Sequence, residues 1–437
     1  MHGFREEPMA TDIPLQLKVK DIFVPGGNPK YTYQSRDKYQ IESKLKSAIE
    51  RMNKFIVVAG QTKSGKTVLV RRIVPKENSV WIEGGHINKI EDIWQTILDE
   101  LTIPNSMTKS ESTQSEEIST LEVGAGVKPF GIGSEIKNVD SSKFASTKGL
   151  SSTHNINITK AAVSAVSDSN KVLVIDDFHY LDKAIQTSII RSLKPAVFDG
   201  LKVVLVLIPH RMHQAAQAEM DVDGRTYTIP VPQWETEELF LIGKTGFDLL
   251  NISFTNETVT FLVNECFNSP HLMQDFCSNL CYEQNISEQF LGPKPFPEIK
   301  TPEPLDGFFK TFSESISPET FKALRRGPER TNRKERTMSS GGTCDTYEAV
   351  LLALHELEGV TPVDWSSLRK ALLKVLSEAP QQHEVTRALE KMDEIAKTRH
   401  GEPAIDYVKE QGELHLVDPF FRYYLKWNTS ILDDKNK

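Results

Sequence analysis

Apolar positions in the first half of the chain follow two different periods. Short, mostly aliphatic runs predict buried strands at 54–59, 79–82, 171–177, 201–208 and 225–231. Between them, apolar residues at every third or fourth position predict helices at 36–53, 67–74, 90–101 and 183–193. Near-continuous apolar strands that alternate with helices are typical of a parallel, doubly wound sheet, so we predict an α/β fold.

From Thr236 onward the pattern becomes helical. It predicts helices at 236–250, 256–267 and 270–285, and later at 345–357, 365–376 and 383–398. Two extended pieces around 404–408 and 413–417 come next, and a last helix covers about 419–427. Three helices followed by a hairpin is the order of a winged helix.

Composition suggests where these regions end. Ser, Thr, Gly, Asn and Lys dominate residues 105–160, which predicts a surface insertion, and residues 286–305 are rich in Pro. The predicted organisation is an arm at 1–30, a core at 31–233 that contains the insertion, a helical lid at 234–286, a linker with a basic stretch at 287–344, and a winged-helix domain at 345–437.

The segment between the first strand and its helix carries the clearest chemistry. It matches the phosphate-binding pattern G-x-x-x-x-G-K-[ST] with Gly60, Gln61, Thr62, Lys63, Ser64, Gly65, Lys66 and Thr67, and Val68 follows. Glycines let backbone N–H groups face phosphate oxygens at a helix N-terminus. We predict that this loop binds ATP or ADP, with Lys66 at the β- and γ-phosphates and Thr67 as a ligand of Mg²⁺.

The strand at 171–177 ends in two carboxylates. Asp176 is predicted to hold Mg²⁺, directly or through water, and Asp177 to orient the attacking water. An alternative is that Asp177 only supports the metal shell. Together with Lys66, these residues predict hydrolysis of ATP to ADP and phosphate.

Further candidates follow the later strands. His210 and Arg211 come after the strand at 201–208, beside the expected γ-phosphate, as sensors or as a solvated basic turn. Arg225 precedes the last strand and is predicted to act on a neighbouring subunit's nucleotide, or to be a surface residue. Pro270 and His271 begin a lid helix at the place where such lids contact nucleotide.

Bulk properties limit the alternatives. The net charge of −8 gives no global attraction to nucleic acid or to a membrane surface. No apolar run approaches the roughly 18 residues that a membrane span requires, and the first residues do not form a signal peptide. The four cysteines form no C-x-x-C pair, so we expect reduced, buried thiols in a cytoplasmic protein.

Taken together, these motifs resemble those of AAA+ ATPases, and within them the origin-recognition-like group and the prokaryotic STAND signalling ATPases. The resemblance covers about 20–285 and 345–428. It implies that Arg225 is an arginine finger, that His210 takes the sensor-one place, and that Asn268-Ser269-Pro270 corresponds to a G-x-P element. His271 stands near the place of a sensor-two Arg, whose absence implies slow turnover. Residues 414–427 resemble the end of the winged domain in such ATPases.

Three functions follow from this resemblance and from the residues. The first is an ATP-driven switch that forms homo-oligomers and signals to a separate effector or sensor, a role that includes prokaryotic antiphage defence. The second is a DNA-binding initiator, helicase loader or transposition regulator, which the winged helix and the basic residues of 322–336 favour. The third is a nucleotide-gated scaffold with little turnover.

Overall fold

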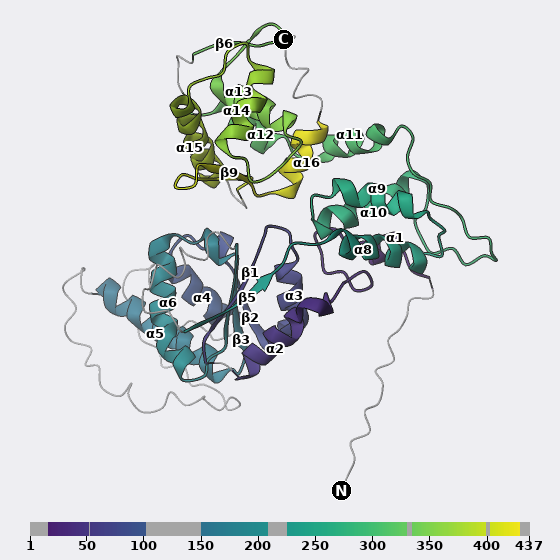
Figure 1. Cartoon of the computed structure of the whole chain (residues 1–437). Helices are drawn as coiled ribbons and strands as arrows, with labels where there is room; N and C mark the ends of the chain where they lie inside the picture. The colour runs from purple at the N-terminus through teal and green to yellow at the C-terminus, as the bar shows by residue number, and fades with distance from the viewer. Residues whose placement is uncertain are drawn as a thin grey trace, which may run out of the picture.

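The computed structural model describes residues 16–51, 53–101, 150–208, 225–329, 334–398 and 403–428. These residues form an α/β core, a helical lid and a C-terminal helical domain with a small hairpin (Figure 1).

The core contains one five-stranded sheet in which every paired strand is parallel. Its strands are β1 (Phe55–Gly60), β2 (Ser79–Glu83), β3 (Val172–Asp176), β4 (Val203–Leu207) and β5 (Thr226–Val231). Their order is β2-β3-β4-β1-β5, and every residue of β1, β3 and β4 is buried. This parallel sheet with helices between its strands confirms the predicted α/β fold class.

Helices cover both faces of this sheet (Figure 1). One face packs against α2 (Ile41–Arg51) and α3 (Lys66–Ile73). The other face packs against α4 (Ile90–Glu100), α5 (Leu150–Asp168) and α6 (Lys183–Phe198). Because the sheet is buried on both sides, its strands are apolar throughout rather than alternating, which is the pattern that made them visible in the sequence.

Short 3₁₀ turns join several of these elements. They are η1 (Asp37–Tyr39), η2 (Lys76–Asn78), η3 (Gly84–His86) and η4 (Phe178–Tyr180). Of these, η3 follows the edge strand β2 and η4 follows β3, so both lie at the carboxyl edge of the sheet.

The lid is formed by α8 (Thr236–Leu249), α9 (Asn256–Glu265) and α10 (Pro270–Glu283), with the short α1 (Val19–Ile22) packed into the same apolar core. Two of its helices begin with side-chain caps, because the hydroxyls of Thr255 and Ser269 accept hydrogen bonds from the backbone N–H three residues on. Pro270 occupies the first turn of α10, where its missing N–H costs nothing.

The C-terminal domain has the element order expected of a winged helix. Its elements are α13 (Thr346–Glu356), α14 (Trp365–Val375), α15 (Gln382–Thr398), the antiparallel strands β8 (Ile405–Val408) and β9 (Glu413–Leu416), and α16 (Pro419–Trp427). Aspartates at 345, 364 and 418 cap three of these helices.

Residues 287–344, predicted as a linker, contain regular structure. They hold α11 (Leu305–Ser315), α12 (Glu319–Arg326) and the two-stranded β6 (Arg336–Thr337) and β7 (Thr343–Cys344). Short helices beside prolines give a weak periodic signal, and their stability comes from packing on distant residues. Likewise, the end of the predicted 105–160 insertion is helical, because α5 begins at Leu150.

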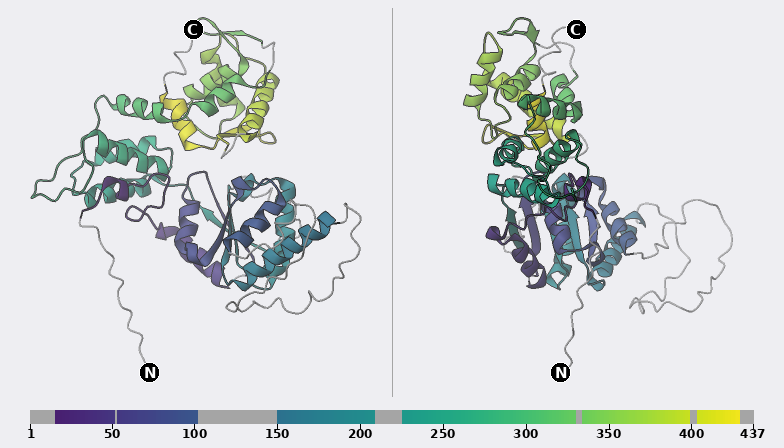
Figure 2. Two further views of the ribbon diagram at one scale, coloured as in Figure 1. Left: turned by 180° about the vertical axis from the view of Figure 1, so that it is seen from behind. Right: turned by 90° about the vertical axis from the view of Figure 1, so that its right-hand side faces the viewer.

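The lid and the winged-helix domain share apolar packing. Tyr423 of α16 is fully buried in the lid cluster, and its hydroxyl donates a hydrogen bond to the carbonyl of Phe309 on α11 at 2.8 Å. Its ring also lies 5.3 Å from that of Phe276 on α10. The views of Figure 2 show the winged-helix domain adjoining the lid through α11 and α16. The two domains are therefore packed against each other through α11 and α16 rather than joined only by a free tether.

Among the helices that the structure describes, none combines the length and apolarity that crossing a bilayer demands.

Candidate nucleotide site

A cavity of about 450 Å³ lies where the core, the N-terminal arm and the lid meet. Its wall contains the predicted residues Lys63, Ser64, Gly65, Lys66, Thr67, Val68, Asp177, Pro270 and His271. The structure therefore brings the loop, the second carboxylate and the start of the lid helix together around one space, although more than 200 residues separate the loop from the lid helix in the sequence.

The loop between β1 and α3 has the form that anion binding requires. Gly65 has φ +90°, a left-handed value that a side chain would strain, and it allows the loop to turn into the N-terminus of α3. The ammonium group of Lys66 is buried and donates a hydrogen bond to the Gln61 carbonyl at 2.8 Å. It is held within the loop, where a phosphate oxygen can replace that carbonyl.

The hydrogen bonding of two hydroxyl groups in this loop indicates whether the loop can accommodate a phosphate. Within the described part of the chain, Thr62 Oγ1 and Ser64 Oγ are buried polar atoms without a hydrogen-bond partner. Buried polar groups are normally satisfied, so this arrangement fits a loop built to surround an additional acceptor. The residues present are therefore compatible with the phosphates of ATP or ADP.

The expected Mg²⁺ ligands are already adjacent. The hydroxyl of Thr67 donates a hydrogen bond to Asp176 Oδ2 at 2.8 Å, and Asp176 is buried. Burial raises the pKa of Asp176, while the hydrogen bond from Thr67 opposes that shift. The described residues contain no group of three His, Cys, Asp or Glu side chains fit to hold a metal alone. The adjacent Thr67 hydroxyl and Asp176 carboxylate suit Mg²⁺, which takes one or two protein ligands together with phosphates and water.

Asp177 lines the cavity from the adjacent position. It has φ 53° and ψ 38°, a left-handed conformation in which the chain turns sharply out of β3 into η4. Its own N–H donates to Asp176 Oδ1 at 3.0 Å. The two residues thus have different surroundings, with the Asp176 carboxylate against Thr67 and Asp177 in the lining of the cavity.

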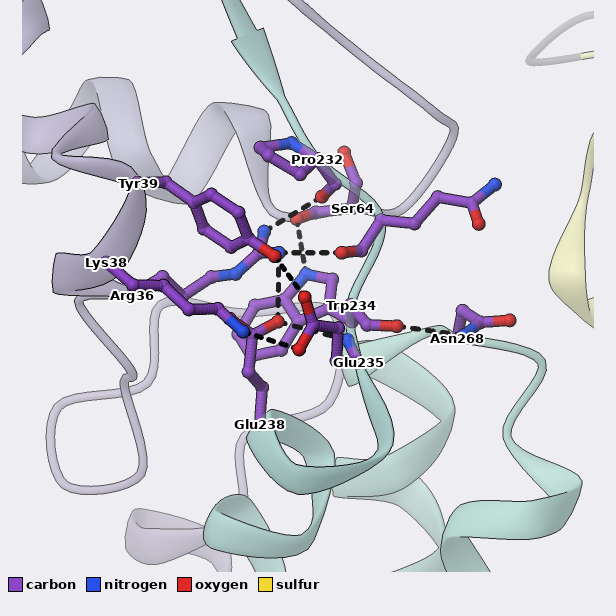
Figure 3. A network of polar contacts seen from close by, with 10 residues as sticks. Arg36, Lys38, Tyr39, Ser64, Pro232, Trp234, Glu235, Glu238 and Asn268 are labelled. Carbon is purple, nitrogen blue, oxygen red and sulfur yellow. Dashed lines mark hydrogen bonds and ion pairs between the residues drawn. The ribbon is translucent and has the colours of Figure 1, made fainter.

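Figure 3 shows a polar network that ties the loop to the lid. The indole N–H of Trp234 donates to the Ser64 carbonyl at 2.8 Å, and the guanidinium group of Arg36 lies 4.6 Å from the Trp234 ring centre. Arg36 also donates to the carbonyls of Pro232 and Gln233, at 2.9 and 2.7 Å.

The same network reaches α8 and the start of α10. Arg36 lies 2.9 Å from Glu238 Oε2, and the Asn268 side-chain amide donates to the Trp234 carbonyl at 2.8 Å (Figure 3). Because its side chains are almost fully buried, the Arg36–Glu238 pair is poorly screened by salt. The connection between core and lid is therefore held by hydrogen bonds and an ion pair, and the phosphate loop takes part in it through Ser64.

His271 and Asp275 on α10 contact each other on the lid side of the cavity, with Nε2 and Oδ2 3.5 Å apart. Burial, assisted by the nearby Lys63 ammonium, lowers the pKa of His271 to about 4. Burial also raises the pKa of Asp275 to about 6. At pH 7 His271 is therefore neutral while Asp275 is mostly ionised, so the contact joins a neutral imidazole to a carboxylate and is not an ion pair.

The winged-helix domain also reaches the phosphate loop. Lys63 Nζ lies 2.9 Å from Asp418 Oδ1 at the start of α16 and 4.0 Å from the ring centre of Phe420. The Phe420 ring in turn lies edge-on to His271, with centroids 4.9 Å apart. One loop residue that lines the cavity therefore contacts the winged-helix domain directly, and Phe420 connects it to the lid.

Of the three remaining predicted residues, the structure describes Arg225 only. Arg225 is exposed and precedes β5 at the amino edge of the sheet, where its carbonyl accepts the N–H of Phe55 at 2.9 Å. Six residues of strand, at roughly 3.3 Å each, place it about 20 Å from the phosphate loop of its own chain. His210 and Arg211 lie outside the described residues.

Sequence reasoning missed the contributions of the arm, of the core–lid joint and of α16. The cavity is also lined by Tyr33, Arg36, Trp234 and Gln274, and Asp418 contacts Lys63 in its wall. Arg36 and Trp234 are single residues in irregular segments. No spacing rule links such residues to a loop that lies elsewhere in the sequence.

No family model and no curated protein sequence matches the chain. Among solved structures, the Walker-type ATPase of Pyrococcus abyssi is 12% identical, with 89% of this chain and 95% of that chain covered and a TM-score of 0.48. The ORC2 protein of Aeropyrum pernix is 11% identical, with 96% and 98% covered and a TM-score of 0.47. A STAND protein with a tetratricopeptide repeat sensor from Pyrococcus horikoshii is 14% identical, with 88% and 41% covered and a TM-score of 0.35. These likenesses concern the fold alone.

Proposed function

We propose that this chain is an ATP-binding and ATP-hydrolysing AAA+ switch whose nucleotide state controls the position of its lid and winged-helix domain. The observation that carries the proposal is the contact of Lys63, within the phosphate loop, with Asp418 of the winged-helix domain at 2.9 Å. A domain held by the nucleotide loop itself responds directly to what that loop binds.

The cavity supplies the groups that hydrolysis needs. Bound ATP with Mg²⁺ supplies the phosphoryl group that is transferred to water. Lys66 stabilises negative charge on the phosphates, Thr67 and Asp176 hold the metal ion, and Asp177 accepts the proton of the attacking water. Without a sensor-two Arg at His271, turnover is slow.

Arg225 is too far from the phosphate loop of its own chain to act there. In the proposed switch it reaches the nucleotide of a neighbouring copy, so that ATP favours assembly of a homo-oligomer. The assembled form then signals to a separate effector or sensor protein. Prokaryotic signalling in the cytoplasm, including antiphage defence, is the setting that the resemblance to STAND ATPases favours.

The DNA-binding alternative rests on the winged helix, and the charges on that domain weigh against it. Helix α15, the third of the domain, carries four acidic and three basic side chains. Its Lys391 and Lys397 pair with carboxylates at 2.5 and 2.6 Å, and Lys409 of the wing pairs with Glu390 at 2.7 Å. DNA phosphates would compete with these carboxylates for all three of these lysines.

The basic stretch at 322–336 is also largely occupied. Arg325 lies 2.7 Å from Glu348, and Lys334 and Arg336 both pair with Glu384. Arg330 and Arg333 fall outside the described residues. This pairing favours docking of the winged-helix domain on protein over its use as a DNA reader.

ATP turnover with and without duplex DNA, across a salt series, separates the two functions. A protein-directed switch shows the same turnover in both conditions, whereas a DNA machine shows stimulation that declines steeply with salt. Lys66→Ala is the control that abolishes nucleotide binding, and Asp177→Asn should bind ATP but hydrolyse it on the order of 100-fold or more slowly than the wild type. Equal turnover by the wild type and Asp177→Asn would contradict the proposed catalytic role.

Assembly is tested on the same proteins. Asp177→Asn with ATP should elute as an oligomer in size exclusion with light scattering, and as a monomer with ADP. A single mass in both nucleotides would exclude assembly driven by ATP.

A further inference from the structure

The turn after the edge strand β2 lies against the catalytic end of β3. Glu83 and Asp176 are partners in the parallel register of the two strands, so the next residues, Gly84 and Asp177, leave the sheet side by side. Gly84 then begins η3 and Asp177 precedes η4.

Gly84 has no room for a side chain. A Cβ atom there would lie 2.5 Å from the carbonyl oxygen of Asp177 and 3.0 Å from that of Asp176. Both of these atoms belong to the backbone, which cannot swing aside as a flexible side chain does. Gly84 does not have a positive φ, so alanine is excluded at this position by space rather than by its own conformation.

The carbonyl oxygen for which Gly84 leaves space belongs to Asp177, whose backbone is in the left-handed conformation. A left-handed conformation costs a non-glycine residue about 1–2 kcal/mol and persists only where the surroundings impose it. Around Asp177 those surroundings include the N–H of Tyr180, which donates to the Asp177 carbonyl at 2.9 Å. Gln186 extends the support, because its amide donates to the carbonyls of Phe178 and Leu181 at 3.2 and 2.8 Å.

We propose that Gly84 is a positioning residue for hydrolysis, because the space it leaves allows the Asp177 backbone to adopt the turn that directs its carboxylate into the nucleotide cavity. The inference rests on the proposed ATPase function, since it concerns the group that handles the attacking water. Gly84 is not among the residues that line the cavity, and in this proposal it acts only through Asp177.

The neighbouring residue Gly85 provides a matched control. A Cβ atom at Gly85 would lie 3.7 Å from the Tyr180 ring, which is an ordinary contact, and Gly85 likewise lacks a positive φ. Gly84→Ala and Gly85→Ala therefore add the same methyl group to the same turn, and only the first displaces the Asp177 carbonyl.

The experiment compares kcat, KM and nucleotide affinity in the full chain. Misplacing a catalytic group by about 1 Å costs on the order of 100-fold, so Gly84→Ala should lower kcat 10- to 100-fold. Its affinity for a fluorescent ATP analogue should stay within about 2-fold of the wild type, since Lys66 and the loop are untouched. Gly85→Ala should match the wild type in kcat, affinity and melting temperature. An unchanged kcat in Gly84→Ala overturns the inference.

A double-variant cycle tests whether the effect passes through Asp177. In an Asp177→Asn background the base is already lost, so Gly84→Ala should cause no further fall in kcat. A further fall by the same factor would show that Gly84 acts independently and would overturn the inference. If the wild type hydrolyses no ATP at all, the proposed function is wrong. If the wild type is active and Gly84→Ala has the same kcat, only the inference about Gly84 is wrong.

A stability measurement applies if Gly84→Ala proves poorly folded. Glycine at position 177 lets the displaced peptide rotate without strain, so Asp177→Gly should restore the melting temperature of Gly84→Ala. Absence of any rescue would show that the clash lies elsewhere, and the inference would be wrong.

Discussion

Lys63 and Asp418 are 355 positions apart in the sequence, yet the ammonium of one lies 2.9 Å from the carboxylate of the other. Lys63 belongs to the phosphate loop, and Asp418 caps the last helix of the winged-helix domain. Both side chains are partly shielded from water, with 30% and 22% of their surface exposed, so the pair is stronger than a surface ion pair. A nucleotide that changes the charge around Lys63 therefore changes how firmly the winged-helix domain is held.

The first prediction concerns this pair. Asp418→Asn removes the charge but keeps an oxygen that can cap α16, because asparagine is as good a cap as aspartate. We expect faster release of a fluorescent ADP analogue and greater protease sensitivity between the lid and the winged-helix domain. The melting temperature of the protein should change little. Asp364→Asn is the matched control, since Asp364 caps α14 in the same way and has no contact with the loop among its described bonds. Identical release rates in both variants would contradict a holding role for Asp418.

The second prediction concerns Arg225. Arg225→Ala should abolish turnover, by roughly 10³-fold or more if it acts as an arginine finger, while nucleotide binding is kept. Mixing it with Asp177→Asn, which keeps the Arg but lacks the base, should restore part of the activity, because mixed oligomers contain intact sites. Titrating the two variants against each other measures this, and failure of rescue at every ratio would argue against action between subunits.

A third prediction follows from the lowered pKa of His271. Its folded-state pKa of about 4 lies below the usual 6.5, so the unfolded chain takes up a proton first as the pH falls. Above pH 6.5 His271 is neutral in both the folded and the unfolded chain, so it does not affect the free energy of unfolding. As the pH falls from 6.5 to 4, this residue lowers the free energy of unfolding. The loss for this one group is on the order of 3 kcal/mol.

Urea unfolding of the wild type and of His271→Asn at pH 7, 6, 5 and 4 measures this contribution. The variant should lose less stability than the wild type over that range. Asp275, whose pKa is raised to about 6, has the opposite effect, and it is present in both proteins and cancels in the difference. Parallel curves for the two proteins would refute the neutral state of His271.

The fourth prediction concerns the shared core. Tyr423→Ala removes a fully buried ring and should destabilise the protein by about 3–5 kcal/mol. Hydrogen exchange should increase in α9, α10 and α11 although Tyr423 belongs to α16, because its partners lie there. Leu351→Ala, a change inside the winged-helix core, should increase exchange mainly within that domain. Confinement of the Tyr423→Ala effect to the winged-helix domain would show that the lid does not depend on it.

Sequence periodicity predicted most elements to within a few residues, because each one's apolar pattern is local. The predicted last helix at 419–427 coincides with α16, whose start is marked by an aspartate followed by proline. By contrast, α11 was missed. Phe309 and Phe312 in that helix are stabilised by Tyr423, more than a hundred residues away.

The site was predictable only where a motif fixes spacing. Lys66 and Asp177 were identifiable because strand, loop and helix follow one another with little freedom, and both line the cavity. Arg36, Trp234 and Asp418 were not, since each acts through a contact that only the folded chain creates. The steric demand at Gly84 was equally invisible, because it depends on the register of β2 against β3.

The burial of Tyr423 among lid residues has a mechanical consequence. With α16 anchored in the lid, the lid and winged-helix domain are expected to turn together as one body about the joint at Trp234. The wing at 405–416 ends two residues before Asp418, which contacts Lys63 of the phosphate loop. A partner that pulls on the wing therefore pulls on the loop through a segment only a few residues long.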